Sequence, residues 1–219
     1  MTDQESRPWR LTGRPSPEEA VALGQRVIET AYAIFITRGF VATSFEAVAA
    51  AADVNKRTIY RRYETKANLF YAVIRWKFGQ FVQRHASEPP KGDELTFLRT
   101  LFRNLLDFTL EADVLRLLKV IISESDRFPE IIEQVFLGRT TRLALIIEDA
   151  LCALADRGML HIPDVVAARK RLVSGVCADA WLMPMLGLST LQTREERDLF
   201  FEERWASVLT QYSAKSANL

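Results

Sequence analysis

Helical periodicity runs through nearly all of this chain, and few residues interrupt it. Its 219 residues include only 9 Gly and 8 Pro, and most of these mark breaks between helix-like patterns. In the segment 21–38, Val27, Ala31, Ile34 and Phe35 recur at the spacing of one helix face. No strand-like alternation, hairpin signal or internal repeat occurs. The pattern therefore predicts an all-α fold of about nine helices.

The segment after Gly39 predicts a short helix built from small residues. Thr43 at the N-cap and Glu46 three residues later fit a capping box. The helix then contains the run AVAAAA, residues 47–52. Asp53 follows, and Asp tolerates the left-handed backbone that a tight turn requires.

Two further helices are predicted directly after this turn. Asn55 can cap a helix that ends near Tyr63, and Thr65 can cap a longer helix from Lys66 to about His85. The order is thus a short helix, a turn of about three residues, a second short helix and a long helix leading away. This order is typical of a helix-turn-helix at about residues 44–63.

The second short helix concentrates positive charge. Four bases and no acid lie between residues 54 and 63: Lys56, Arg57, Arg61 and Arg62. Residues 1–85 hold 13 Lys/Arg against 8 Asp/Glu, whereas residues 86–219 hold 16 against 20. This asymmetry indicates that the first part of the chain meets a polyanion.

The small residues of the first short helix suit a brace for a second helix that enters the major groove of DNA. Ala49 and Ala52 allow close approach, and Val48, Val54 and Ile59 can fill the angle between the helices. The side chains left outside can donate to phosphates or base edges: Lys56, Arg57, Thr58, Tyr60 and Arg61. A solvated basic face would explain an isolated run of bases, but not the brace, turn and caps together.

Residues 21–81 resemble the DNA-binding domain of the tetracycline-repressor (TetR) family. The matching residues are Phe35, Gly39 and Phe40 at the end of the first helix, then Val48-Ala49, Thr58-Ile59-Tyr60, Tyr63, Lys66 and Leu69. Asp53 departs from the family pattern, in which Gly is commonest at this position.

The resemblance implies which residues bind DNA. Phosphates would be contacted by Thr43 or Ser44, by Tyr60 and by Lys66, whereas Lys56, Arg57, Thr58 and Arg61 would face the groove. Lys66 also lies at a helix start, where a positive charge is unfavourable, so a partner anion is expected. Arg62 is either structural or a bridge to an acid.

The chain is expected to have three parts. These are an N-terminal arm (1–20), a helix-turn-helix domain (21–85) and a C-terminal regulatory and dimerisation domain (95–213). The Pro/Gly-rich stretch Ser87–Glu94 would separate the two domains. Arg10 and Arg14 in the arm could enter a minor groove, although a disordered tail is the alternative. Beyond the break, helices are expected at about 95–109, 112–126, 129–157, 163–187 and 194–212.

The segment ESDRFPEI, Glu124–Ile131, resembles a corner of the AefR-like C-terminal subclass of the TetR family. That resemblance implies a small-molecule pocket and a dimer built by the last two helices. One candidate stripe for the dimer seam comprises Phe201, Trp205, Val208 and Tyr212, and another comprises Val165, Leu172, Val173, Val176 and Trp181. An ordinary intramolecular core is the alternative.

The effector and its pocket cannot be identified from the sequence. Candidate apolar lining residues are Phe102, Leu106, Phe108, Trp181, Met183 and Met185, although each also suits a plain core. A charged contact could come from Arg116, Lys119 or Glu124. An apolar pocket would favour a lipophilic effector.

Other classes of protein fit the sequence poorly. His85 and His161 are far apart, and no nucleophile, phosphate-loop or dinucleotide motif occurs, so neither an enzyme nor a metal or cofactor is expected. Cys152 and Cys177 are expected to be buried free thiols. No apolar run spans a bilayer and the N-terminus is not a secretion signal, so a cytoplasmic protein is expected.

The sequence therefore predicts a homodimeric transcriptional regulator of double-stranded DNA. We expect a repressor that a small effector releases from a palindromic operator. The alternative is a helical adaptor that binds a protein partner through its basic N-terminal face.

Overall fold

The computed structural model describes residues 16–86, 92–129, 141–188 and 190–213. Its helices are α1 (Pro17–Arg38), α2 (Phe45–Ala51), α3 (Lys56–Tyr63), α4 (Lys66–His85), α5 (Glu94–Thr109), α6 (Ala112–Ser123), α8 (Arg142–Asp156), α9 (Val165–Val173), the π-helical turn η2 (Ser174–Ala178), α10 (Asp179–Met185) and α11 (Arg194–Thr210). The described residues contain no β-strand, only an isolated bridge between Leu160 and Ser213. The prediction of an all-α fold is confirmed.

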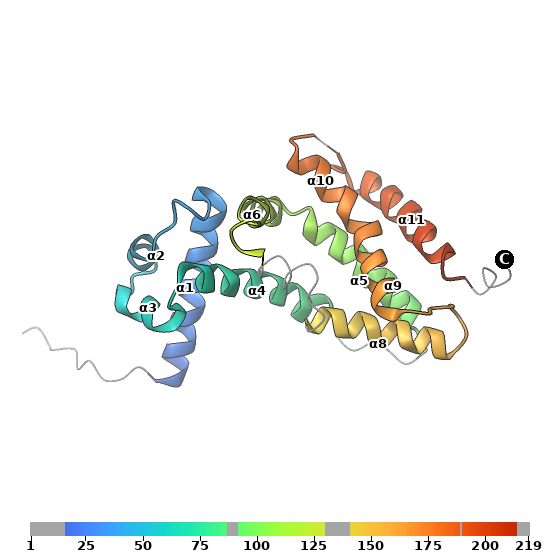
Figure 1. The fold of residues 1–219 in the computed structure, drawn as a ribbon, viewed down its shortest axis with the longest axis horizontal. Helices are drawn as coiled ribbons and strands as arrows, with labels where there is room; N and C mark the ends of the chain where they lie inside the picture. The colour runs from blue at the N-terminus through green and yellow to red at the C-terminus, as the bar shows by residue number, and fades with distance from the viewer. Residues whose placement is uncertain (1–15, 87–91, 130–140, 189, 214–219) are drawn as a thin grey trace, which may run out of the picture.

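The helices form two groups that share the long helix α4 (Figure 1). α2 and α3 lie at one end against α1 and α4, and α5, α8, α9, α10 and α11 form the other end. α6 packs against α1 and therefore lies between the two groups. The expected boundary falls mostly on residues 87–91, which lie outside the described residues.

The first helix begins earlier than expected. The Ser16 hydroxyl accepts a hydrogen bond from the Glu19 N–H (3.1 Å), and the Glu19 carboxylate accepts one from the Ser16 N–H (2.8 Å). Pro17 occupies the first turn, where its missing N–H costs nothing. This capping box starts α1 four residues before Val21, inside the expected arm. Arg10 and Arg14 lie outside the described residues.

The start of α2 differs from the prediction by one residue. Ser44, not Thr43, is the N-cap, and its hydroxyl accepts from the Ala47 N–H (3.1 Å). Thr43 is only 1% exposed, and its hydroxyl donates to the carbonyl oxygen of Gly39 (2.7 Å). The predicted Thr43–Glu46 capping box is therefore wrong, because the Thr43 hydroxyl bonds back to the end of α1.

The other caps of this region are as predicted. Asn55 Oδ1 accepts from the Arg57 N–H (2.9 Å), which begins α3. The Thr65 hydroxyl accepts from the Asn68 N–H (3.1 Å), which begins α4. Asp53 has a φ of 51°, in the left-handed region, as the turn between α2 and α3 requires.

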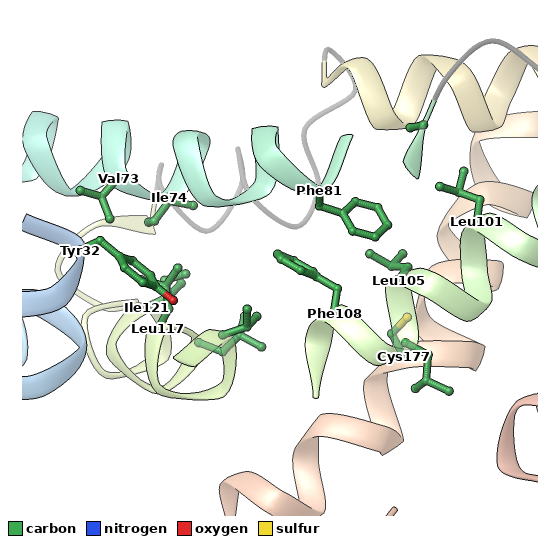
Figure 2. Close-up of a cluster of buried hydrophobic side chains, with 14 of the residues drawn as sticks. Tyr32, Val73, Ile74, Phe81, Leu101, Leu105, Phe108, Leu117, Ile121 and Cys177 are labelled. Carbon is green, nitrogen blue, oxygen red and sulfur yellow. The ribbon is translucent and has the colours of Figure 1, made fainter. Parts of the chain in front are cut away.

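The apolar core is continuous between the two groups of helices. Figure 2 shows Tyr32 of α1 and Ile74 of α4 facing Leu117 of α6. Farther along α4, Phe81 packs on Phe108 of α5, with ring centroids 5.0 Å apart. These contacts attach α4 to both α5 and α6. A displacement of either helix would therefore change the packing against α4.

Two helices of the C-terminal part begin differently from the prediction. The first part of the helix expected at 129–157, residues 130–140, lies outside the described residues, and α8 begins after Thr141. Asp164 caps α9 by accepting from the Ala167 N–H (3.0 Å), so Pro163 precedes the cap rather than opening the helix.

The expected dimer stripe is buried inside the single chain. Its members Phe201, Trp205, Val208 and Tyr212 are all buried. Trp205 is 5% exposed and packs on Phe102 and Phe201, each with a centroid distance of 5.8 Å. In the second stripe, Leu172 and Val176 are fully buried, and Val165, Val173 and Trp181 are partly buried. The alternative, an intramolecular core, is therefore correct for the stripe of α11 and for Leu172 and Val176.

The two cysteines lie in different environments. Cys177 is buried in the core, where burial raises the pKa of its thiol to about 12. Cys152 on α8 is exposed, so the expectation that it is buried is wrong. Its apolar sequence neighbours point inward from other faces of the helix, which leaves the thiol outside.

Candidate nucleic-acid interface

Small and apolar side chains hold α2 and α3 against each other. Val48 on α2 and Ile59 on α3 are both inaccessible to solvent, and Ala49 and Ala52 are buried beside them. In the turn, the Val54 N–H donates to the Ala49 carbonyl oxygen (3.0 Å). This packing turns the remaining faces of α3 outward, as a helix that enters a groove requires.

The outward face of α3 is basic. Lys56, Arg57, Tyr60 and Arg61 are exposed, and Thr58 is half-buried. Lys56, Arg57 and Arg61 form no ion pair with any other described residue. These three bases can therefore meet an external anion, although the charge of Lys56 also helps to lower the pKa of Glu46.

Tyr60 is held in place from α2. Its ring lies edge-on to Phe45 (4.7 Å, 84°), and its hydroxyl donates to Glu46 Oε1 (3.2 Å). The pKa of Glu46 is lowered by its own backbone N–H at the helix start and then by the Tyr60 hydroxyl. The same contact raises the pKa of Tyr60. A carboxylate thus lies within the basic surface, a feature that sequence reasoning missed because the two residues are 14 positions apart.

Ser44 is the exposed member of the pair Thr43 and Ser44. It lies at the N-terminus of α2, where free backbone N–H groups and the helix dipole favour an anion. The burial of Thr43 removes its side chain from the surface, so Thr43 does not share this position.

The ammonium group of Lys66 lies against the chain rather than in open solvent. Its Nζ donates to the carbonyl oxygens of Phe40 (2.8 Å) and Val41 (3.1 Å) and lies 4.5 Å from the Phe40 ring centroid. Burial, and then the charge of Arg127, lowers its pKa. In the chain alone, the ammonium group of this lysine is therefore met by two carbonyl groups and not by an anion.

Arg62 is a packing residue. Its Nη1 donates to the Ala20 carbonyl oxygen of α1 (3.4 Å), and its guanidinium lies over the Tyr63 ring (5.9 Å). It covers Gly24, where an added Cβ would collide with the guanidinium group. Of the two readings of Arg62, the structural one is supported, and Gly24 leaves room for the guanidinium group.

None of the residues expected to line an effector pocket borders either of the two depressions found among the described residues. Phe102, Leu106 and Phe108 are buried in the core, Trp181 and Met185 are half-buried, and Met183 is exposed. Two open depressions of about 420 and 360 Å³ instead lie beside α10 and α11 and share Thr190 and Leu191. Arg116, one of the three residues expected to supply a charged contact to the effector, instead pairs with Asp113 on the surface of α6.

The described ranges show neither a candidate metal site nor a candidate membrane span. Among these residues, no cluster of His, Cys, Asp and Glu could hold a metal ion. Within the same ranges, no helix is long and apolar enough to span a membrane.

Family profiles match both parts of the chain. Residues 27–73 match the bacterial regulatory proteins of the tetR family, and residues 96–214 match the C-terminal domain of AefR-like transcriptional repressors. The first match includes all of α2 and α3 and the start of α4. The second extends from α5 to beyond α11.

Individual relatives agree with these matches. The chain is 28% identical over 120 residues to the HTH-type transcriptional regulator AcrR of Shigella flexneri, an alignment that covers 52% of this chain and about half (54%) of that protein. The flavonoid-responsive regulator FrrA has a similar structure, with a TM-score of 0.71 and 26% identity over 88% of this chain and 98% of FrrA. A Mesorhizobium loti protein assigned to the TetR family has the same fold, with a TM-score of 0.74 and 22% identity over 89% of this chain and 98% of its own.

Proposed function

We propose, from the premise that this chain belongs to the TetR family of bacterial transcriptional regulators, that α3 binds the major groove of an operator in double-stranded DNA. Lys56, Arg57, Thr58 and Arg61 would face base edges and phosphates. Ser44 would donate to a phosphate, and so would Tyr60 once its hydroxyl proton turns from Glu46 to the DNA; contacts of this kind fix the position of the helix on the duplex. The family comprises regulators and not enzymes, which agrees with the sequence analysis.

The observation that carries this proposal is the outward face of α3. Three unpaired bases lie on an exposed helix whose opposite face, with Ile59 and Tyr63, is buried against its neighbours. A helix held so firmly presents its donors in one fixed arrangement, which suits sequence-selective binding better than a flexible basic segment would.

Selection of bound duplexes from a random DNA pool tests the proposal. We expect the selected sequences to contain a palindrome, and affinity for it to fall steeply as salt rises. The adaptor alternative predicts no enriched sequence and retention of a protein partner instead. A pool without any enriched motif at low salt would overturn the proposal.

A dimer would place two α3 helices on the two halves of such a palindrome. Because the expected stripe of α11 is buried, the dimer needs another surface. Leu182 of α10, Leu186 directly after α10 and Leu199 of α11 are exposed apolar side chains, and Leu199 borders one of the open depressions. α11 lies at the end of the molecule away from α2 and α3, and α10 lies between α11 and α6 (Figure 1). We assign this surface to the second copy.

We further propose that the protein represses transcription and is released by a lipophilic, aromatic effector. One support is the similarity to the flavonoid-responsive regulator FrrA. The physical requirement is that the effector binds better to the conformation that cannot hold both half-sites. As a DNA-binding regulator, the protein would act in the cytoplasm.

A panel of flavonoids tests the effector class. Each compound would be added to the complex of protein and selected operator, and release would be followed by fluorescence anisotropy. We expect at least one flavonoid to release the DNA and to raise the melting temperature of the free protein. Benzoate serves as a small anionic control. Release by benzoate alone would contradict the lipophilic class without affecting the DNA-binding proposal.

A further inference from the structure

A cluster of four aromatic rings joins the two groups of helices beside the helix-turn-helix. Phe40 is its centre, and it lies in the segment between α1 and α2, residues 39–43, here called the Phe40 turn. The ring of Phe40 lies 5.9 Å from Phe35 of α1, 5.3 Å from Phe70 of α4 and 5.0 Å from Phe128. Aromatic pairs of this kind each contribute about 0.5–1.5 kcal/mol beyond the burial of area.

Phe128 reaches this cluster from the C-terminal part of the chain. It belongs to residues 124–128, here called the α6 corner, where the N–H groups of Arg127 and Phe128 donate to the Glu124 carbonyl oxygen (3.1 and 2.9 Å). The Arg127 guanidinium lies over both rings, 5.9 Å from Phe40 and 5.3 Å from Phe128. The α6 corner therefore rests directly on the Phe40 turn.

Lys66 holds the same turn from the start of α4. Its ammonium group bonds the carbonyl oxygens of Phe40 and Val41 and lies over the Phe40 ring. These acceptors carry partial negative charge, which offsets the unfavourable position of a lysine in the first turn of α4. Within the turn, the Thr43 hydroxyl bonds Gly39, and Ser44 then begins α2. The place where α2 begins thus depends on the Phe40 turn.

We propose that Lys66 is a positioning residue rather than a phosphate ligand: it fixes the Phe40 turn to α4, and through that turn the α6 corner sets the position of α2 and α3. Lys66 and Phe128 then act on DNA binding through one shared contact. This inference rests on the proposed DNA binding.

The dependence of affinity on salt separates positioning from phosphate contact. A lysine that neutralises a phosphate contributes about 0.9 to the slope of log affinity against log salt, so its loss in a dimer lowers the slope by about 2. A positioning lysine contributes affinity but no counterion release. Replacing it should weaken binding similarly at every salt concentration.

The first experiment compares the full-length protein with Lys66→Met, which keeps the apolar stem and removes the charge. We expect the affinity for the selected operator to fall about 5-fold or more with an unchanged salt slope. Arg57→Ala is the matched control, because this exposed base has no partner among the described residues, and its loss should lower the slope. A fall of about 2 in the slope for Lys66→Met would overturn the proposal.

A second experiment needs no DNA. Amide hydrogen exchange of the free protein should be faster in the Phe40 turn for both Lys66→Met and Phe128→Ala than for the unmodified chain. A residue that only binds phosphate would leave the free protein unchanged, so unaltered exchange in Lys66→Met would also overturn the proposal. This readout remains valid if a variant binds no DNA at all.

The double variant tests the shared contact. If Lys66 and Phe128 act through the Phe40 turn, their effects on operator affinity should not add, and the double variant should lose less than the sum of the two losses. Additive losses would refute the link to the α6 corner. If the unmodified protein selects no DNA sequence, the proposed function fails, whereas the exchange data still decide the role of Lys66.

Discussion

The hydroxyl of Tyr60 donates a hydrogen bond to Glu46 Oε1 across 3.2 Å, which joins the exposed face of α3 to the first turn of α2. The contact occupies the single hydroxyl proton of a tyrosine proposed to bind phosphate, so this proton has to turn from Glu46 to the phosphate when DNA binds. The contact also places a carboxylate on the surface that would face DNA, since Glu46 is exposed. The arrangement keeps one negative charge of the chain where a polyanion would approach.

Glu46→Gln is therefore expected to strengthen DNA binding. The amide oxygen can still accept from Tyr60, so the geometry is kept while one negative charge is removed from each subunit. At a separation of several ångströms in solvent, we expect a gain of about 3-fold in affinity at low salt. The gain should shrink as salt rises, because the effect is screened. Anisotropy titrations over a range of salt would measure it.

Asp149→Asn is the control for this prediction. It makes the same change in net charge on the exposed face of α8, far from α3 and from the surface assigned to the second copy. Its effect on DNA affinity should be negligible at moderate salt. Equal gains from the two variants would show that net charge, and not the position of Glu46, is responsible.

Lys56→Ala and Arg57→Ala should change which bases are preferred. Both side chains are exposed at the start of α3, the end of a recognition helix that contacts base edges. A contact to a base edge contributes roughly 1–3 kcal/mol of discrimination. Repeating the selection from random DNA with each variant would reveal the relaxed positions. An unchanged motif in both variants would place these residues on phosphates only. Lys170→Ala on α9 is the control and should leave the motif intact.

The sequence was informative where structure depends on local contacts. The all-α fold, the caps Asn55 and Thr65 and the left-handed Asp53 were predictable because each involves residues within a few positions of one another. Ser16 and Glu19 carried the same kind of local signal, but the capping box they form was missed. Thr43 and Ser44 are adjacent candidates for one cap, and only the packing of Thr43 against the end of α1 decides between them.

Contacts between distant segments could not be read from the sequence. The apolar stripe of α11 suits a dimer seam and a core equally well, and the position of Phe102 on α5 decides for the core at Trp205. Likewise, a lysine at the start of α4 predicts a partner with negative charge but not its identity. The contact of Lys66 with the Phe40 turn depends on a pair of residues 26 positions apart.

Gly24→Ala should reveal the packing role of Arg62. An alanine inside a helix is normally more stable than glycine by about 0.5–1 kcal/mol. Here the added Cβ would displace the Arg62 guanidinium, so we expect the gain to be lost in the otherwise unmodified chain. In an Arg62→Ala background the gain should return. Urea unfolding of the four proteins gives the coupling, and a coupling of zero would show that Arg62 does not press on Gly24.

The two cysteines should react at very different rates. Cys152 is exposed and Cys177 is buried, so a thiol reagent at neutral pH should modify one thiol per folded chain and two per unfolded chain. Burial raises the pKa of Cys177 from about 9, its value when exposed, to about 12. The contribution of this neutral thiol to stability is therefore complete below pH 9 and is lost as pH rises from 9 to 12. Cys177→Ala should show less of this alkaline loss. Rapid labelling of both thiols in the folded chain would contradict the burial.

Leu199→Lys and Trp205→Lys place the same charge on α11. The first variant should dissociate the dimer, whereas the second should unfold part of the chain. Leu199 is 64% exposed and lies four residues from both Glu195 and Glu203, so a lysine there suits the free helix. We expect Leu199→Lys to give folded monomers with weak operator binding, because the second half-site contact is no longer intramolecular. Trp205 is enclosed by Phe102 and Phe201, so Trp205→Lys should unfold the C-terminal helices, since an unpaired charge cannot be buried there.

Light scattering and circular dichroism on the same samples distinguish dissociation from unfolding. A Leu199→Lys dimer of normal affinity would place the interface elsewhere, and a folded Trp205→Lys monomer would return Trp205 to the interface.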